Sequence, residues 1–254
     1  MIAKTETEIT ALREGGRRLG TILRVLAADI RPGISTAELN ERAESLIRAG
    51  GDAPAFLNYT PQGARRPYPG TLCASVNEEV VHGIPNEKPR TLKEGDIIAL
   101  DLGLVHDGLI VDAALTVGVG VVDATAKKLI KTAQAALSAG IKKTKVGNTI
   151  GDIGYAIGVV IEKAGFVAAN ELGGHAVGKR VHEEPFVPNW GVPGSGVKLA
   201  EGMVLALEPI VNEGTANIKQ LSDGYTIVTR DGKRSSHFEH TILITKKGPE
   251  ILTK

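Results

Sequence analysis

The 254-residue sequence is poor in cysteine and aromatic residues and has almost no net charge. Cys73 is the only cysteine, which excludes an internal disulfide framework and cysteine-rich zinc sites and fits a reducing compartment. Lysine and arginine number 30 against 29 acidic residues, so no long-range field favours nucleic acid or an anionic membrane as the main partner. No segment approaches the roughly 18 consecutive apolar residues of a membrane span, and the first residues, MIAKTETEIT, lack the apolar stretch of a secretory signal. We therefore expect a cytoplasmic protein.

Helical patterns occur in two pairs. Apolar spacing predicts a helix from Glu6 to about Ile30, and Ser35 followed by Glu38 forms a capping box that predicts the start of a second helix. The second pair covers about 123–141 and the segment VGNTIGDIGYAIGVVIEKAGF. Residues 52–72 are predicted to form a loop.

The two halves of the sequence resemble each other. The second helix of each pair aligns at an offset of 114 residues, which matches Thr149 to Ser35. LKEGDIIALDLG, from Leu92, resembles LAEGMVLALEPI at an offset of 107, which matches Glu208 to Asp101. Helix caps and Glu-Gly turns are common, so a chance match is the alternative. The paired acids favour a pseudo-twofold arrangement, with one domain built from halves of about 1–120 and 121–254 and its site on the axis.

Two acids interrupt strands that otherwise read as buried core. Asp101 lies in IIALDLGLV and Asp112 in LIVDAAL, and the turn sequence VHDG between them predicts a β-hairpin. A four-residue turn over 105–108 would place the two aspartates directly opposite each other, with Cβ atoms roughly 5 Å apart.

Facing carboxylates in an apolar sheet repel each other and lose hydration, at a cost of several kcal/mol unless something compensates. A shared proton would suit an aspartic protease dyad, but its Asp-Thr/Ser-Gly loops are absent. An arginine would have to come from a distant segment. A hard divalent cation remains, and carboxylate oxygens are suitable ligands for it.

Three further residues have the same character: Glu208 in GMVLALEPIV, Glu239 in SHFEHTILIT and His175 in LGGHAVG, where glycines allow close backbone approach. Each alone has an ordinary structural explanation, but together with the two aspartates they favour a metal site. Four carboxylates and one neutral imidazole carry a charge of −4, which balances two divalent ions. The donor set suits Mn, Fe or Co more than structural zinc, although zinc can also bind such a site.

Five motifs resemble those of the bacterial type I methionine aminopeptidases, in the pita-bread metallopeptidase group, in order and spacing over nearly the full length. They are CASVNEEVVHGIP, LDLGLVHDGLIVDAA, GGHAVGKRVHEEP, MVLALEPIV and DGYTIVTRDGKRSSHFEHTILIT. The resemblance implies the pita-bread fold, an α+β architecture in which a mostly antiparallel, pseudo-twofold sheet is covered by helices.

The resemblance also implies roles for individual residues. The four acids and the histidine above become the ligands of a dinuclear metal centre, with Asp112 and Glu239 bridging the two ions. His82 resembles the family's substrate-amide histidine and His182 its second non-ligand catalytic histidine. The pocket for the methionine side chain would be formed by Tyr68, Cys73, Val181 and Tyr225.

The sequence departs from the family pattern at several positions. Ala176 stands where glycine is usual, Val181 where an aromatic residue is usual, and Tyr225 where tryptophan is frequent. The loop before Cys73, NYTPQGARRPYPGT, is longer than usual. These differences fall on the methionine pocket, so its shape is the least predictable part of the site.

The implied activity is removal of the N-terminal methionine from peptides and nascent chains, at the ribosome among other places, by a monomeric enzyme. Two divalent ions would activate a water molecule, Glu208 would shuttle its proton, and His82 and His182 would hold the amide and the developing oxyanion. An Xaa-Pro peptidase uses the same ligands but normally has a substantial extra N-terminal domain, and only about 50 residues precede the first pocket segment here. A metal-free binding protein on the same scaffold is the alternative of another class, which the complete ligand set argues against.

Overall fold

The computed structural model describes residues 1–254 and contains four α-helices and fifteen strands. The helices are α1 (Glu6–Asp29), α2 (Thr36–Ala49), α3 (Ala124–Lys143) and α4 (Ile150–Lys163). The strands are β1 (Ala53–Pro54), β2 (Leu72–Val76), β3 (Glu79–Val81), β4 (Ile97–His106), β5 (Leu109–Gly118), β6 (Val167–Ala168), β7 (Gly173–Ala176), β8 (Glu183–Pro188), β9 (Val204–Leu207), β10 (Ile210–Asn212), β11 (Ile218–Gln220), β12 (Ile227–Thr229), β13 (Ser235–His237), β14 (His240–Thr245) and β15 (Gly248–Ile251).

The helices begin where side chains satisfy the free backbone N–H groups of the first turn. The predicted capping box at the start of α2 is confirmed, because Ser35 accepts from the backbone of Glu38 and the Glu38 side chain accepts from the backbone of Ser35. Thr149 and Asp152 form the same box at α4. No helix is both long and apolar enough to cross a membrane.

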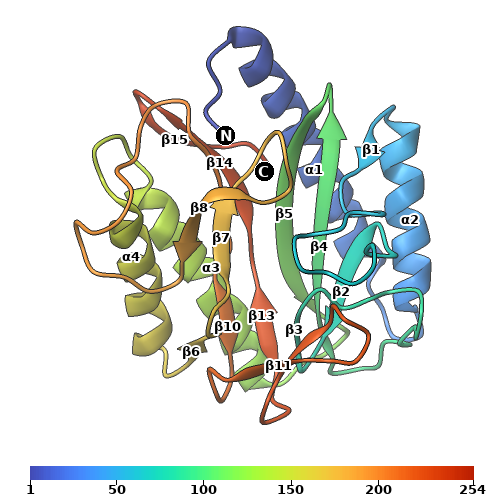
Figure 1. The fold of residues 1–254 in the computed structure, drawn as a ribbon. Coiled ribbons are helices and arrows are strands. Elements are labelled where there is room, and N and C mark those ends of the chain that lie inside the picture. The colour runs from blue at the N-terminus through green and yellow to red at the C-terminus, as the bar shows by residue number, and fades with distance from the viewer.

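Two antiparallel sheets form the centre of the molecule, and two helices pack on each (Figure 1). Strands β1, β4 and β2 pair in that order, with β5 on β4, and five strands pair in the order β15-β14-β9-β7-β8. One core of 28 buried residues fills the space between α1, α2 and the first sheet, and a second core of 21 lies mainly between α3, α4 and the second sheet. The predicted α+β class is confirmed.

The hairpin of β4 and β5 has a different register from the prediction. Its turn contains only Asp107 and Gly108, which both adopt positive φ (48° and 76°), as a tight hairpin turn requires. Asp101 therefore lies opposite Ala114, and Asp112 opposite Gly103. The predicted direct pairing of the two aspartates is wrong by two residues. Because strand side chains alternate with a period of two, the shift leaves both acids on the same face as diagonal neighbours.

The two halves repeat their backbone contacts at the offsets found in the sequence. The N–H of Gly33 donates to the carbonyl of Leu92 (2.8 Å), and the N–H of Gly147 donates to that of Leu199 (3.0 Å). Both glycines have φ of +92°, which side-chain-bearing residues rarely adopt. Each half thus ties the turn before its second helix to the segment leading into its central strand.

The halves meet along β5 and the segment 237–241. Ala114 and Glu239 exchange backbone hydrogen bonds (3.4 and 2.8 Å). On one side of this pair the Thr116 hydroxyl bonds both the N–H and the carbonyl of His237, and on the other the Thr241 hydroxyl bonds both groups of Asp112. The matching threonines define a pseudo-twofold axis between Ala114 and Glu239.

Candidate metal centre and active site

A cavity of about 990 Å³ opens between the two sheets. All eleven residues that the sequence predicted for the site line it: Tyr68, Cys73, His82, Asp101, Asp112, His175, Val181, His182, Glu208, Tyr225 and Glu239. Residues separated by more than 170 positions in the chain therefore line one cavity, and the fold gathers every predicted candidate.

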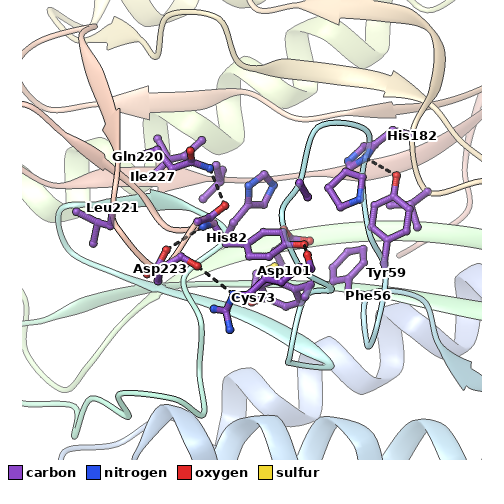
Figure 2. Close-up of a pocket in the computed structure, with 18 of the residues that line it drawn as sticks. Phe56, Tyr59, Cys73, His82, Asp101, His182, Gln220, Leu221, Asp223 and Ile227 are labelled. Carbon is purple, nitrogen blue, oxygen red and sulfur yellow. Dashed lines mark hydrogen bonds between the residues drawn. The ribbon is translucent and has the colours of Figure 1, made fainter.

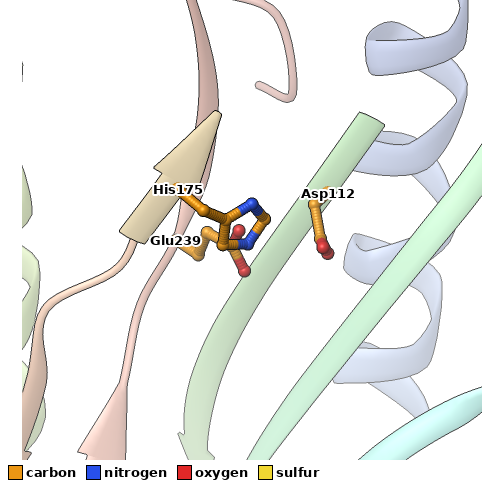
Figure 3. A group of neighbouring side chains, drawn as sticks. All are labelled: Asp112, His175 and Glu239. Carbon is orange, nitrogen blue, oxygen red and sulfur yellow. The ribbon is translucent and has the colours of Figure 1, made fainter. Parts of the chain in front are cut away.

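Acids and a histidine from both halves form the floor of the cavity. Asp101 and Asp112 come from β4 and β5, Glu208 directly follows β9, and Glu239 lies between β13 and β14. Ligand atoms of Asp112, His175 and Glu239 all lie within 4.8 Å of one another, and Figure 3 shows the three side chains pointing together. Glu208 Oε1 lies 3.5 Å from His175 Nε2, which joins it to the same group.

The position of His175 depends on close packing of β7 against β9. A Cβ added to Gly174 would lie 2.2 Å from the carbonyl oxygen of Ala206, so only glycine permits this approach. His175 Nδ1 lies 3.0 Å from the carbonyl oxygen of Ala176, which can only accept. Nδ1 therefore carries the proton, and the lone pair of Nε2 faces the carboxylates, where it can bind a metal.

The carboxylates lack the partners that buried charges require. Asp101 Oδ1, Asp112 Oδ1 and Glu239 Oε1 are buried without a hydrogen bond. Burial and, after it, the charge of Asp112 raise the pKa values of Asp101 and Glu239 well above their usual range. Burial and, as the next largest cause, the negative charge of Glu208 raise the pKa of Asp112 to about 8. The unpaired oxygens of Asp112 and Glu239 belong to the group whose ligand atoms lie within 4.8 Å of one another, and Asp101 lines the same cavity. Such a group fits a divalent metal ion, which supplies the missing positive charge.

Glu208 differs from the other acids. Burial alone would raise its pKa, but the nearby histidines, above all His237, hold the pKa below its usual range. His237 Nε2 lies 3.3 Å from Glu208 Oε2 and 3.9 Å from Glu239 Oε2, without the alignment of a hydrogen bond. His237 was not predicted from the sequence as a site residue. Its place two residues before Glu239, on the same face of an extended segment, was the available indication.

His82 and His182 both line the cavity, and they come from different segments of the chain (Figure 2). His82 has φ of +59°, an unusual backbone conformation for a non-glycine residue that places it between β3 and Gly83. Burial lowers the pKa of His82, and burial and then His175 lower the pKa of His182 to about 4. His182 is exposed to solvent on the cavity wall, although the protein groups around its ring desolvate it. Both imidazoles are therefore neutral near pH 7.

The predicted pocket residues form one apolar cluster beside the carboxylates. Tyr68 and Tyr225 pack edge to face with ring centroids 5.1 Å apart, and Cys73 and Val181 are buried in the same cluster. The Tyr68 hydroxyl donates to the carbonyl oxygens of Leu72 and Gly83, so its ring is fixed. Burial and then Asp101 raise the pKa of the Cys73 thiol well above its usual range, so Cys73 acts as packing and not as a nucleophile.

Two aromatic residues of the segment 52–72 complete the pocket, and neither was predicted from the sequence. Phe56 is buried in the cluster with Val181, and Tyr59 packs against it. A Cβ at Gly103, opposite Asp112, would lie 2.6 Å from the Phe56 ring, so that glycine makes room for it. Because loop residues follow no periodic pattern, the sequence gives no indication of which loop aromatic turns inward.

Comparison with known proteins agrees with this geometry. Residues 10–246 match metallopeptidase family M24. A methionine aminopeptidase from Clostridium perfringens is 44% identical over 253 residues, covering 100% of this chain and 98% of the relative. The crystal structure of a methionine aminopeptidase from Thermotoga maritima superposes with a TM-score of 0.93 at 41% identity, covering 100% of both chains.

A prolidase from Pyrococcus horikoshii shares the fold, with a TM-score of 0.76 at 23% identity, but this chain covers only 63% of it. The predicted pita-bread fold is thereby confirmed. The chain belongs to metallopeptidase family M24 and, within it, to the methionine aminopeptidases.

Proposed function

We propose that this chain is a metal-dependent methionine aminopeptidase that removes the N-terminal methionine from peptides and nascent proteins. One observation supports the proposal above the others: unpaired buried carboxylates and a histidine lone pair converge beside an apolar pocket lined by aromatic side chains. The centre favours a cation, and the pocket favours a flexible apolar side chain such as methionine.

The proposed ligands are Asp101, Asp112, His175, Glu208 and Glu239, which would hold two divalent ions. Manganese, iron or cobalt suits this oxygen-rich set, and zinc can also bind it. Such ions supply an activated water near neutral pH and polarise the scissile carbonyl. The formal charge of −4 on the four carboxylates supports the proposal of two ions.

The other residues act on the substrate. Glu208 has the lowered pKa of a group ready to accept a proton, and we propose that it takes one from the attacking water and passes it to the leaving amine. His182 donates a hydrogen bond to the carbonyl oxygen as negative charge develops there, and His82 holds the scissile amide. Phe56, Tyr68 and Tyr225 enclose the methionine side chain.

The proposed substrates include nascent chains as they leave the ribosome, which would place the enzyme in the cytoplasm. We further propose that it acts as a monomer, because all eleven site residues predicted from the sequence line one cavity of a single chain, which leaves no predicted role for a residue from a second copy.

Peptide selectivity tests the proposal. With Mn²⁺ or Co²⁺ restored, the chain should cleave Met-Ala-Ser at least about 100-fold faster than Leu-Ala-Ser or Ala-Pro, and Glu208→Gln should lower kcat by about 10²–10⁴-fold at saturating metal. Faster turnover of Ala-Pro would instead identify an Xaa-Pro peptidase. A chain that neither binds nor regains a divalent metal would be a binding protein on this scaffold.

A further inference from the structure

Tyr59, which neither the sequence analysis nor the proposed mechanism uses, contacts His182 directly. Its hydroxyl oxygen lies 3.2 Å from His182 Nδ1, and the two rings are tilted by 54° with centroids 5.7 Å apart. Figure 2 shows the contact at the wall of the cavity, away from His82. No other hydrogen bond engages either of the two atoms.

The chemistry of the two groups fixes the direction of this hydrogen bond. A phenol is a stronger acid than a neutral imidazole, and an imidazole nitrogen is a better acceptor than a phenol oxygen. Burial raises the pKa of Tyr59, so the phenol keeps its proton at neutral pH. The favoured arrangement is therefore Tyr59 O–H donating to Nδ1 of His182.

We propose that Tyr59 is a positioning residue that holds His182 as the Nε2–H tautomer. A neutral imidazole has one N–H donor and one acceptor nitrogen, so an accepting Nδ1 requires the proton on Nε2. This inference rests on the proposed function, in which His182 donates to the substrate carbonyl. With the other tautomer, Nε2 would present a lone pair to the carbonyl oxygen and repel it.

Backbone contacts hold the Tyr59 hydroxyl in place. The N–H of Asn58 donates to the carbonyl of Tyr68 (2.9 Å), and the N–H of Tyr68 donates to the carbonyl of Tyr59 (2.8 Å), which closes the base of the long loop. Asn58 has φ of +65°, the conformation that turns the chain at this base. The loop therefore presents the hydroxyl from a fixed frame even though its tip lies at the rim of the cavity.

The segment that carries His182 is fixed as well. The side chain of Glu183 accepts from the N–H groups of Lys179 (2.7 Å) and Arg180 (2.9 Å), so the turn before His182 is closed by its own neighbour. The backbone segments of both Tyr59 and His182 are therefore fixed. Because neither segment can shift to suit the other, the hydrogen bond from the Tyr59 hydroxyl selects the tautomer of the His182 ring.

Nitrogen-15 NMR of histidine side chains reads the tautomer directly and requires no turnover. The zinc-loaded, histidine-labelled protein has six histidines, and the His182 signals are assigned by their loss in His182→Gln. We expect the Nε2–H pattern in the native chain and a mixed pattern in Tyr59→Phe. An Nδ1–H pattern in the native chain, or a spectrum unchanged by Tyr59→Phe, would overturn the proposal whatever peptides the enzyme cleaves.

Kinetics separates tautomer control from a role in the pocket wall. Tyr59→Phe keeps the ring, so kcat for Met-Ala-Ser should fall about 5–20-fold while KM changes less than about twofold. Tyr155→Phe, an exposed tyrosine on α4, is the matched control and should leave both constants unchanged. A rise in KM with kcat unchanged would assign Tyr59 to side-chain binding and contradict the positioning role.

Discussion

At the scale of single residues, the buried carboxylates of the candidate metal centre destabilise the folded state unless a cation neutralises them. Asp101, Asp112 and Glu239 are all buried, and each has an oxygen without a partner. Their pKa values are raised because burial and mutual repulsion disfavour the charged forms. The same residues would be stable as ligands, since bound ions remove both penalties.

These raised pKa values predict how the metal-free protein responds to pH. Between the unfolded pKa near 4 and the folded pKa, which is about 8 for Asp112, the folded chain binds more protons than the unfolded chain, so stability falls as pH rises. His182 and His240, with pKa values lowered to about 4, act in the opposite sense below about pH 6.5. The free energy of unfolding of chelator-treated protein should therefore fall between pH 6.5 and 8, by on the order of 1–2 kcal/mol.

Denaturant titrations at several pH values would measure this slope. Asp112→Asn, which cannot ionise, is the control and should be flatter over the same range. If the free energy of unfolding of the native chain stayed constant or rose between pH 6.5 and 8, other protein groups would already stabilise the ionised acids without metal.

At the scale of elements, two threonines join the halves behind the metal centre. Thr241 accepts from the N–H of Asp112 (2.9 Å) and donates to its carbonyl (2.7 Å), while Thr116 does the same for His237 (2.9 and 2.8 Å). Both threonines are buried. Each hydroxyl therefore satisfies both backbone groups of a residue in the other half.

Thr241→Val removes the hydroxyl while keeping the side-chain shape, and it leaves the buried N–H and carbonyl of Asp112 unsatisfied. We expect a loss of about 2–3 kcal/mol in unfolding free energy and roughly 10-fold weaker metal binding, because the strand that carries Asp112 loses its support. Thr116→Val, its symmetry mate, should lose similar stability with a smaller effect on the metal. Calorimetry and metal titration measure both, and a neutral Thr241→Val would refute the supporting role.

The helices and strands differ in how far the sequence predicts them. The four helices were predictable because caps and apolar spacing are local features, as at Ser35 and Thr149. The hairpin was predictable but its register was not, because the turn could contain two or four residues and only Asp107 and Gly108 accept positive φ. The residues of the candidate metal centre were predictable because an acidic residue inside an apolar strand is unusual and indicates a buried partner for its charge. Phe56, Tyr59 and His237 depend on tertiary packing, which leaves little local trace.

At the scale of the whole molecule, the two halves share their cores. Val204, Ala206, Leu243 and Leu252 from the second half are buried in the core beneath α1 and α2. A Cβ at Gly16 or Gly20 of α1 would lie within 2.5 Å of the backbone at Leu252 or Lys254, so the first helix packs directly on the last segment. We propose that 1–254 is a single catalytic domain, although its two halves have like designs.

This sharing predicts that neither half folds alone. The full chain should unfold in a single cooperative transition, whereas fragments 1–120 and 121–254 should give circular dichroism spectra without a cooperative melt, because each would expose apolar core surface. A fragment with its own sharp transition would show two domains instead of one.

Metal stoichiometry tests the central claim most directly. Metal-free protein is dialysed against Mn²⁺ or Co²⁺ at pH 7.5, and the bound metal per chain is measured for the native protein, Asp112→Asn and, as a remote control, Asp107→Asn in the exposed hairpin turn. The account predicts two ions in the native chain and the control, and fewer or weaker in Asp112→Asn, together with recovery of Met-Ala-Ser cleavage. A native chain that binds no divalent ion, or binds it equally well without Asp112, would contradict the account.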